Sequence, residues 1–570
     1  MTGVRTRARA VAAATLAAAL LAGCASIPTD GRVRQGGDDV ARGGDIGIIA
    51  PGPAFDAEPD AIVRGFLQAA QAGPTSTTPF SVAREYLTAP AEDAWKPYSQ
   101  VIVLDGVMQV ESPETVDEQP DRAVVHASGT LVASVDENGV YTEEPAPSTK
   151  ETTFELTREA GQWRITSLED GLLMPSQFFT STYHQTRLYF PTPDLKSWVP
   201  DVRWFPQQTW RTNAVQEILA GPPDWLGAAV APVLPAGTAL ALNSVTKGPD
   251  GRYQVPLTDQ VSEASGAARG LFAAQLRATL SDATGESAGV TLLDRNGPIV
   301  PPVVDTPAFP RTSGLALVLR DGRLWNLAGR QLQVADVDAD LHGLDPTALA
   351  LGSGADPVVV RDGTTRIVRV TGHREVLLEG TSLVAPSVDR FGTTWSGDRT
   401  GPIQAVLSTG GQYPVSAPWL EGRVILSLAV SPDGARIAVV SSGAGGQLVQ
   451  VAGIVRDAHG VPTALPEPLT VGNPVHGVTR AVWQDEAVLA LLGQEDGAFG
   501  VYLAGVGGQG GSAGGLTRRL TGITDVAALS ASVGSGGILA LDNQGVLYLH
   551  ESSAVWPVVG QGVSLMAFPG

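Results

Sequence analysis

The chain is poor in the residue types that build most disulfide, zinc and nucleic-acid sites. It has one cysteine and four lysines in 570 residues, and aromatic residues make up only 6%. A single cysteine excludes an internal disulfide and a set of zinc thiolates. The formal net charge is −20, and no stripe of Lys and Arg interrupts this acidic balance. Because phosphate binding needs clustered cations, we expect no nucleic-acid partner.

Metal and cofactor motifs are also missing. The histidines have no metal-ligand spacing, and we interpret His126 and His184 as surface or core residues rather than bases. The glycine run at 505–515 lacks the Lys-Ser/Thr of a phosphate loop, so we interpret it as a flexible insertion. The sequence therefore predicts no metal, no cofactor and no catalytic residue.

Pairs of acidic residues are the one pattern that suggests hydrolysis. Asp336 with Asp338, and Glu379 with Asp389, are examples. A glycosidase needs two carboxylates about 5 to 9 Å apart in a cleft, whereas acidic residues scattered over turns are usually solvated. We predict that the chain is not an enzyme. A cell-wall hydrolase or carbohydrate-binding envelope protein is the alternative, and a passive scaffold in envelope assembly is a third hypothesis.

The single cysteine lies where an N-terminal processing signal ends. Three arginines (Arg5, Arg7 and Arg9) precede an uncharged run over 10–22, and Leu21-Ala22-Gly23-Cys24 follows the pattern of a bacterial lipobox. The apolar run is about a dozen residues, roughly 18 Å as a helix, which is too short for a hydrocarbon core of about 30 Å. We predict a signal peptide over 1–23 and lipid attachment at Cys24. An ordinary signal peptide with a chance cysteine is the alternative.

The mature chain then reads as a tether followed by folded domains. Residues 24–57 are rich in Gly, Asp and Pro and have no apolar period, which predicts a flexible tether. The alternative is that Ile46-Gly47-Ile48-Ile49 packs on the body as an irregular strand. The chain is 43% hydrophobic and 17% charged, so the remainder can bury sizeable cores.

Residues 58–185 predict an α+β domain. A 3.6-residue apolar period over 58–71 indicates a helix, and a second short helix is expected at 81–87. Strand-like runs follow, separated by turn signals at 137–139 and 160–161. They lie at 101–104, 123–126, 130–135, 152–156 and 162–168. Helices followed by a mostly antiparallel sheet resemble the NTF2-like fold.

Residues 186–300 carry more specific strings. We expect a strand at 188–190, a helix at 213–219 capped by Thr212 or Asn213, and a hairpin around the turn at 247–251. A longer helix containing Leu271–Leu280 and a last strand at 290–292 complete the pattern. The order EILAGPP, LPAGTAL, FAAQLRATL and VTLLDRNG resembles the GerMN domain named for spore-germination proteins. Such a match implies an α+β fold without a catalytic set.

An aromatic cluster stands out in a chain with so few aromatic residues. It comprises Trp198, Trp204, Phe205 and Trp210. One interpretation is an exposed patch for a protein partner, since Trp is favoured at interface hot spots. We favour the other, in which the cluster packs between the first two domains or beneath the helix that follows.

Residues 311–570, after a proline-rich linker, predict an all-β domain. Short apolar runs alternate with Gly, Asp and Ser turns at intervals of roughly 40 to 50 residues, the period of propeller blades. The length allows five to seven blades, of which we favour six. The string Ser-Pro-Asp-Gly at 431–434 resembles an inter-strand turn of TolB-like propellers. A stacked sandwich is the alternative fold.

The order of lipobox, α+β domain, GerMN-like domain and propeller resembles the actinobacterial LpqB lipoprotein family along nearly the whole chain. The resemblance implies a non-catalytic lipoprotein on the extracytoplasmic face of the cell membrane, held by lipid on Cys24. It also implies contact with the extracytoplasmic domain of an MtrB-like sensor histidine kinase. Through that contact the protein would modulate two-component signalling that controls the cell wall and division.

Overall fold

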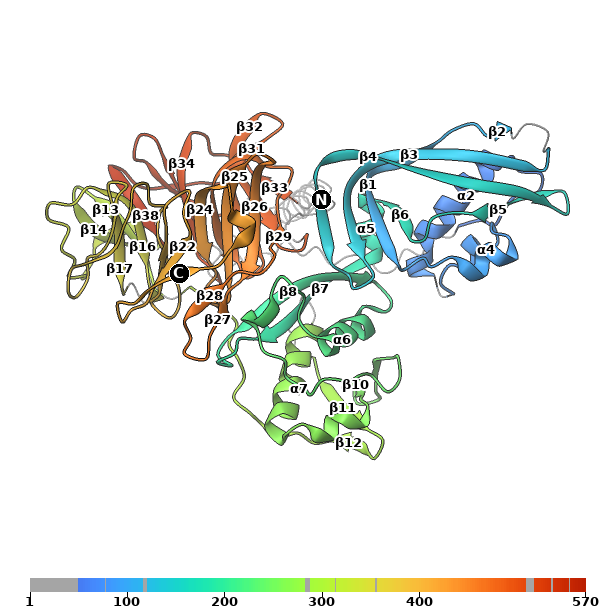
Figure 1. The fold of residues 1–570 in the computed structure, drawn as a ribbon, viewed down its shortest axis with the longest axis horizontal. Helices are drawn as coiled ribbons and strands as arrows, with labels where there is room; N and C mark the ends of the chain where they lie inside the picture. Colours follow the sequence, from blue (N-terminus) through green and yellow to red (C-terminus); the bar gives the residue numbers. More distant parts are fainter. Residues whose placement is uncertain are drawn as a thin grey trace, which may run out of the picture. The chain divides into compact units, whose positions relative to one another are not determined.

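The computed structural model describes residues 50–570, except 77, 116–119, 282–287, 313, 354–355, 509–516, 535–536 and 553. The predicted signal, Cys24, the candidate strand at 46–49 and most of the predicted tether lie outside the described residues. Within the described part the chain is rich in β-strands and has few helices (Figure 1).

The N-terminal part, residues 50–182, packs helices against a sheet. Helix α2 buries Ile62, Val63, Phe66 and Leu67 on one face, as its apolar period requires, and these side chains join the core beneath the sheet. The strands pair in the order β5-β4-β3-β1-β6, and β2 pairs with β3. The elements are α2 (Pro59–Ala72), η1 (Gly73–Thr75), α3 (Ser81–Arg84), α4 (Ala89–Ala94), β1 (Gln100–Val110), β2 (Glu114–Thr115), β3 (Arg122–Asp136), β4 (Tyr141–Glu159), β5 (Gln162–Ser167), β6 (Leu172–Pro175) and α5 (Ser176–Thr182).

Local signals predicted most of this part. The helix expected at 58–71 is confirmed as α2, and the turn at 160–161 is confirmed with positive φ at Ala160 and Gly161. The strands expected at 123–126 and 130–135 are one strand, β3, because its pairing with β4 continues through Gly129 opposite Lys150. The second helix is shorter than expected and ends at Arg84.

A two-stranded ribbon follows, formed by β7 (Tyr183–Pro191) and β8 (Trp198–Pro206). The strands are antiparallel, with Tyr183 opposite Pro206 and Pro191 opposite Trp198. All nine residues of β8 are buried. A strand buried on both faces has packing partners on each side, so the ribbon lies inside the folded body rather than at its surface.

The aromatic cluster belongs to this ribbon and to the helix after it. None of its four members is more than 5% exposed, which confirms the packing interpretation over an exposed patch. Trp204 joins the core of the N-terminal part, whereas Phe205 and Trp210 join the core of the parts that follow. The cluster therefore connects two cores.

The middle part, residues 207–310, contains two helices and a four-stranded sheet of order β12-β11-β10-β9. The hairpin, the longer helix and the strand at 290–292 are confirmed. The first helix begins earlier than expected, and Thr212 is not its cap, because its hydroxyl instead accepts the N–H of Val245 at 3.0 Å. The elements are α6 (Trp210–Ala220), η2 (Gly227–Ala229), β9 (Thr246–Lys247), β10 (Tyr253–Pro256), η3 (Asp259–Glu263), α7 (Gly266–Leu280), β11 (Val290–Asp294) and β12 (Gly297–Ile299).

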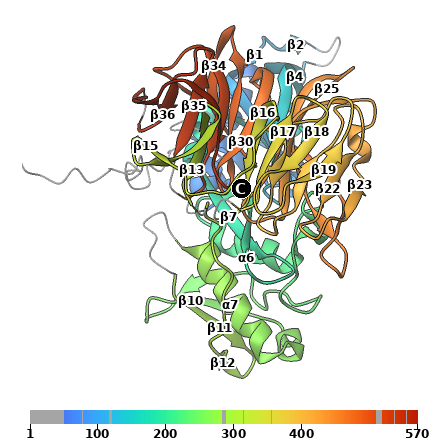
Figure 2. The ribbon, with the colours of Figure 1, turned by 90° about the vertical axis from the view of Figure 1, so that its left-hand side faces the viewer.

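The C-terminal part, residues 311–570, forms six four-stranded antiparallel sheets among its described residues, and Figure 2 shows strands such as β16, β17 and β18 side by side. The strands are β13 (Ala316–Arg320), β14 (Arg323–Ala328), β15 (Gln331–Val334), β16 (Pro346–Leu351), β17 (Val358–Asp362), β18 (Arg366–Arg369), β19 (Glu375–Glu379), β20 (Ser387–Val388), β21 (Thr394–Ser396), β22 (Ile403–Val406), β23 (Gln412–Val415), β24 (Val424–Val430), β25 (Arg436–Gly443), β26 (Gly446–Gly453), β29 (Leu469–Thr470), β30 (His476–Asp485), β31 (Val488–Glu495), β32 (Ala498–Gly505), β33 (Thr517–Leu520), β34 (Val526–Ala531), β35 (Ile538–Asp542), β36 (Leu547–Leu549), β37 (Val558–Gly560) and β38 (Val563–Ala567). A short helix, η5 (Pro418–Leu420), and a separate pair, β27 (Val455–Arg456) with β28 (Pro462–Ala464), complete it.

These six sheets close on themselves. The last strand, β38, pairs with β13 and so completes the first sheet. One edge strand of each sheet contacts the corresponding strands of two other sheets, in the order β38, β16, β20, β24, β30, β34 and back to β38. Such closure covers strand edges that would otherwise pair with other chains. We call these six strands the inner ring.

The middle and C-terminal parts share one hydrophobic core. It combines Leu188 and Phe272 with Val440, Leu491 and Tyr502, among others. The proline-rich segment between the parts also packs on the ribbon, because the N–H of Trp198 donates to the carbonyl of Ala308 at 2.9 Å. The parts are therefore joined by buried contacts as well as by the chain.

Candidate functional site

The ribbon carries a buried ion pair in the middle of its apolar strand. Asp201 and Arg203 are each 3% exposed, and Arg203 Nε lies 2.7 Å from Asp201 Oδ2. Arg203 Nη1 also lies 3.1 Å from Glu217 Oε2 on α6 and donates to the carbonyl of Asn138 at 2.7 Å. Burial raises the pKa of the Asp201 carboxyl, and Arg203 opposes that rise. This pair connects the turn after β3, the ribbon and α6.

A second charge cluster connects the ribbon to the C-terminal part. Glu486 Oε1 accepts hydrogen bonds from Arg187 Nη1 and from the hydroxyl of Tyr189, both at 2.5 Å. Arg187 Nη2 also lies 3.5 Å from Asp485 Oδ2. Burial is the main cause that raises the pKa of the Tyr189 hydroxyl, so it stays protonated and donates to the carboxylate.

The Ser-Pro-Asp-Gly turn lies beside this cluster. Arg436 and Asp433 are both fully buried and lie 2.5 Å apart (Nη2 to Oδ2). Arg436 Nη2 also donates to the main-chain oxygen of Glu486 at 2.6 Å, and its guanidinium lies over the ring of Trp483. Asp433 Oδ1 accepts the N–H of Ala435 and so fixes the turn. The turn that the sequence singled out is thus a buried anchor for an arginine.

The N-terminal part contacts the C-terminal part through β4. The carboxylate of Glu143 accepts the N–H of Asn473 at 2.8 Å, and the Asn473 side chain donates back to the carbonyl of Glu143 at 2.9 Å. Burial raises the pKa of Glu143 to about 7, while the main-chain N–H groups of Asn473 and Gly472 oppose the rise. We call the contacts of the last four paragraphs, together with the ribbon, the junction.

The junction holds charge in place rather than presenting it to a substrate. Each of its carboxylates has a cation or an N–H donor as partner, and the groups that make these contacts are mostly buried. Breaking a buried pair by removing one partner costs about 3 to 5 kcal/mol. The arrangement is therefore suited to fixing the three parts against one another.

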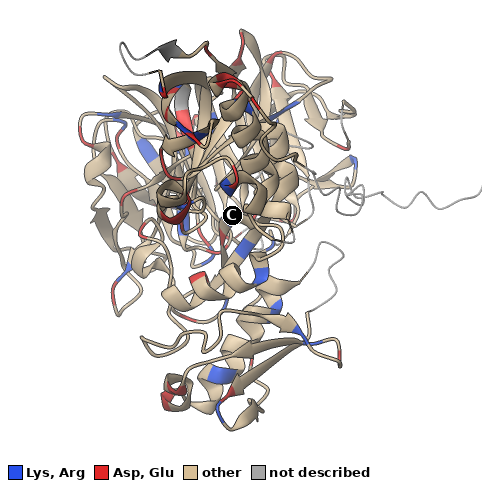
Figure 3. Cartoon of the chain, turned by 90° about the vertical axis from the view of Figure 1, so that its right-hand side faces the viewer, with Lys and Arg blue, Asp and Glu red and all other residues tan. Residues whose placement is uncertain are grey.

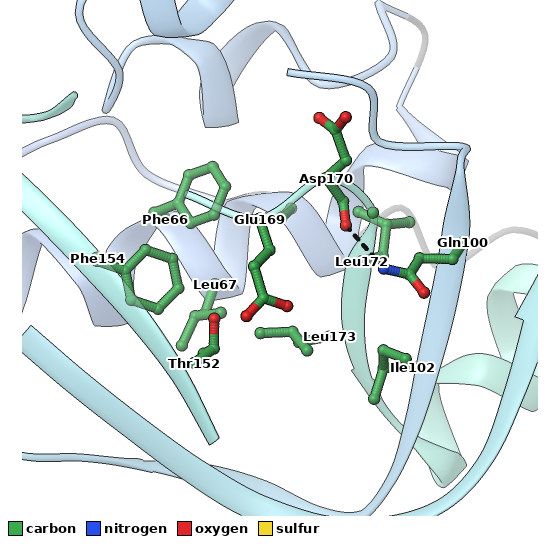
Figure 4. A pocket seen from close by; sticks show the side chains of 12 residues that line it. Phe66, Leu67, Gln100, Ile102, Thr152, Phe154, Glu169, Asp170, Leu172 and Leu173 are labelled. Atoms are coloured by element: carbon green, nitrogen blue, oxygen red, sulfur yellow. Dashed lines mark hydrogen bonds between the residues drawn. The ribbon is translucent and has the colours of Figure 1, made fainter. Parts of the chain in front are cut away.

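A small pocket lies in the N-terminal part, between α2, β1, β4 and β6 (Figure 4). Its wall is apolar, with Phe66, Leu67 and Phe154 among its lining residues. The two acidic residues that line it already have partners. Glu169 lies 2.7 Å from Lys150 Nζ, and Asp170 Oδ1 accepts the N–H of Lys96 at 2.8 Å. They do not form an acid–base pair in a cleft.

The other residues that the sequence singled out lie apart. His126 Nδ1 is 3.1 Å from Thr153 Oγ1 on β4, and the ring of His184 stacks on Trp210 with centroids 4.1 Å apart. Among the described residues, no three His, Cys, Asp or Glu side chains gather as a metal site. In the view of Figure 3, cationic and acidic positions are interspersed over the described chain.

The acidic pairs have different surroundings. Asp336, Asp338 and Glu379 are exposed, as expected for solvated turns. The same expectation is wrong for Asp389, which is fully buried. Its carboxylate accepts hydrogen bonds from Trp395 Nε1 and Arg456 Nη2, because it fixes a turn beneath the neighbouring side chains. None of these arrangements is a carboxylate pair in a cleft.

Cys24 remains a prediction, because it lies outside the described residues. The junction residues were missed, although one signal was present: an Asp and an Arg stand inside the apolar run Trp198–Pro206. Charges in such a run are expensive to bury unless they are paired. None of the helices in the described ranges combines the length and apolar character that a bilayer crossing demands.

Three family models match consecutive segments of the chain. They are described as "Lipoprotein LpqB, N-terminal domain" over residues 52–180, "Sporulation and spore germination" over 187–297 and "Lipoprotein LpqB beta-propeller domain" over 322–569. The six sheets of the C-terminal part thus fall within a segment that matches a propeller family.

Whole-chain relatives agree with these matches. The chain is 31% identical to lipoprotein LpqB of Streptomyces coelicolor, over 92% of each chain. It is 27% identical to lipoprotein LpqB of Bifidobacterium longum over 76% of each, and 27% identical to that of Streptomyces avermitilis over 97% of each. The chain belongs to the lipoprotein LpqB family.

Proposed function

We propose that the protein is a non-catalytic lipoprotein, held by lipid on Cys24 at the extracytoplasmic face of the cell membrane. There it binds the extracytoplasmic part of an MtrB-like sensor histidine kinase and modulates two-component signalling that controls the cell wall and division. Membership of a lipoprotein family supports the anchor, and the lipobox pattern at 21–24 names the residue.

The domain organisation belongs to the same proposal. A signal peptide over 1–23 and a tether over 24–57 precede an NTF2-like domain at 58–185, a GerMN-like domain at 186–300 and a propeller at 311–570. Six blades are favoured, because six four-stranded sheets are present among the described residues and their inner strands contact in a ring.

The observation that carries the proposal is the junction. Buried ion pairs and a shared core join the three parts, so a partner that contacts one part acts on a single body. An anchor would confine this body to the layer of the kinase, where the raised effective concentration lets a weak contact suffice. The kinase responds only if the body binds one of its signalling states more tightly than the other.

The test compares three proteins in intact cells. The full chain carries a photo-crosslinking residue on its surface, a second protein adds Cys24→Ala, and a third replaces 1–24 of that variant with an unrelated membrane-spanning helix. We expect the first and third to capture the kinase and change its phosphorylation, and the released Cys24→Ala protein to do neither. Full effect from the released protein contradicts the anchoring proposal. Turnover of peptidoglycan fragments without kinase capture favours the hydrolase alternative.

A further inference from the structure

Three arginines of the C-terminal part lie where different sheets meet. Arg361 is on β17, Arg399 is in the turn between β21 and β22, and Arg480 is on β30. Each donates to a main-chain oxygen of the next sheet around the inner ring. Arg361 Nη1 reaches Leu383, Arg399 Nε reaches Ile425 and Arg480 Nε reaches Leu529, at 2.9, 3.3 and 3.0 Å.

The guanidinium groups also influence one another. Burial and then the charge of Arg399 lower the pKa of Arg361, and burial and then the charge of Arg361 lower the pKa of Arg480. The sheets of Arg361 and Arg480 are not neighbours, because β16 contacts β38 and β20 whereas β30 contacts β24 and β34. Two side chains from such sheets approach one another toward the middle of the ring.

No carboxylate neutralises this cluster. Among the described residues, none of the three arginines makes an ion pair, and no acidic group opposes the fall in pKa of Arg361 or Arg480. Other buried arginines differ, since Arg203 and Arg436 each lie within 3 Å of an aspartate. An unneutralised set of cations in a chain of net charge −20 is a site where an anion is favoured.

We propose that Arg361, Arg399 and Arg480 form a binding site for a small multivalent oxyanion bearing phosphate or carboxylate groups. The carbonyl contacts use at most two of the five N–H donors of each guanidinium, so donors remain for a ligand. Guanidinium forks match both oxyanion types, and an anion removes the repulsion between the arginines. Arg399 is exposed, whereas Arg361 and Arg480 are half-buried, so the ligand enters past Arg399.

The test is calorimetric titration of the purified full chain in detergent with inorganic pyrophosphate and, separately, with citrate. We expect saturable binding that weakens as sodium chloride screens the charges. Arg399→Gln should lower the affinity about tenfold or more, because it removes charge-assisted hydrogen bonds. Tighter binding of pyrophosphate points to a phosphate-bearing ligand, and tighter binding of citrate points to a polycarboxylate.

Arg374→Gln is the matched control, because Arg374 lies on the same part but pairs with Asp340, 3.2 Å away. Its affinity should equal that of the unchanged chain. Arg399 is exposed, so its variant tests the site even if Arg361→Gln or Arg480→Gln unfolds the sheets. Absence of saturable binding at millimolar pyrophosphate and citrate overturns the proposal, as does an Arg399→Gln protein that binds as tightly as the unchanged chain.

Discussion

The indole N–H of Trp204 donates to the main-chain oxygen of Gly507 at 3.0 Å, although the two residues are 303 positions apart in the chain. Trp204 lies on the ribbon and packs in the N-terminal core, whereas Gly507 follows β32 of the C-terminal part. Close approach of backbone is needed here. A Cβ on Gly507 would lie 2.8 Å from the carbonyl oxygen of Val202.

Gly507→Ala should therefore loosen the junction. The added methyl group clashes with Val202, and the φ of 74° disfavours any side chain, so we expect a loss of about 1 to 3 kcal/mol in stability. Gly497→Ala is the control, because Gly497 has a φ of 75° but no atom within 4 Å of the added Cβ. Thermal unfolding and limited proteolysis measure the difference. Equal losses in both variants would show that backbone strain alone is responsible.

Arg436→Met should be among the most destabilising substitutions in the C-terminal part. It leaves the fully buried Asp433 without its cation, which costs about 3 to 5 kcal/mol in unfolding free energy. Arg64→Met should cost less than about 1 kcal/mol, since its pair with Asp60 is exposed. Denaturant unfolding of both proteins measures the contrast. A combined Asp433→Asn and Arg436→Met protein should regain part of the loss, because no charge is then buried alone.

Glu143 should make stability depend on pH. Its pKa is about 7 in the folded protein and 4.5 ordinarily, so the folded state holds the proton more tightly than the unfolded state. The resulting stabilisation is fully present below about pH 4.5, falls as pH rises to 7 and is lost above that, a change of about 2 to 3 kcal/mol.

Glu143→Gln removes this dependence and keeps an oxygen acceptor for the N–H of Asn473. The variant should be more stable than the unchanged chain at pH 8 and similar at pH 4.5. Denaturant midpoints measured across this range test the expectation. A parallel fall in stability of both proteins between pH 4.5 and 7 would assign the dependence to other groups.

Tyr189 and Glu486 should show coupled effects on stability. The Tyr189 hydroxyl donates to Glu486, so Tyr189→Phe should cost about 1.5 to 3 kcal/mol, as for other hydrogen bonds to charged groups. Once Glu486→Gln has removed the charge, the same change should cost less. A double-mutant cycle by denaturant unfolding gives the coupling energy, expected at about 1 to 3 kcal/mol. Additive losses would mean that this contact adds nothing to the junction.

Local elements were the most predictable features of this chain. Helix α2 follows from its 3.6-residue apolar period, and the turn at 160–161 follows from its glycine, because such signals act within a few residues. The continuity of β3 was missed, since a strand is stabilised by its partner and β4 pairs along its whole length. Helix α5 was missed for a similar reason, as Phe179 and Thr182 are buried by residues distant in sequence.

By itself the sequence determined the family, the periodic strands of the C-terminal part and the position of its single cysteine. Only the tertiary structure decided which charges are buried and with which partners. Arg187 meets Glu486 across 299 residues, and Arg361 meets Arg480 across sheets that are not neighbours in the ring. The physical reason is that desolvation and pairing depend on what the fold places beside a charge, whereas a local period depends only on the residues next to it along the chain.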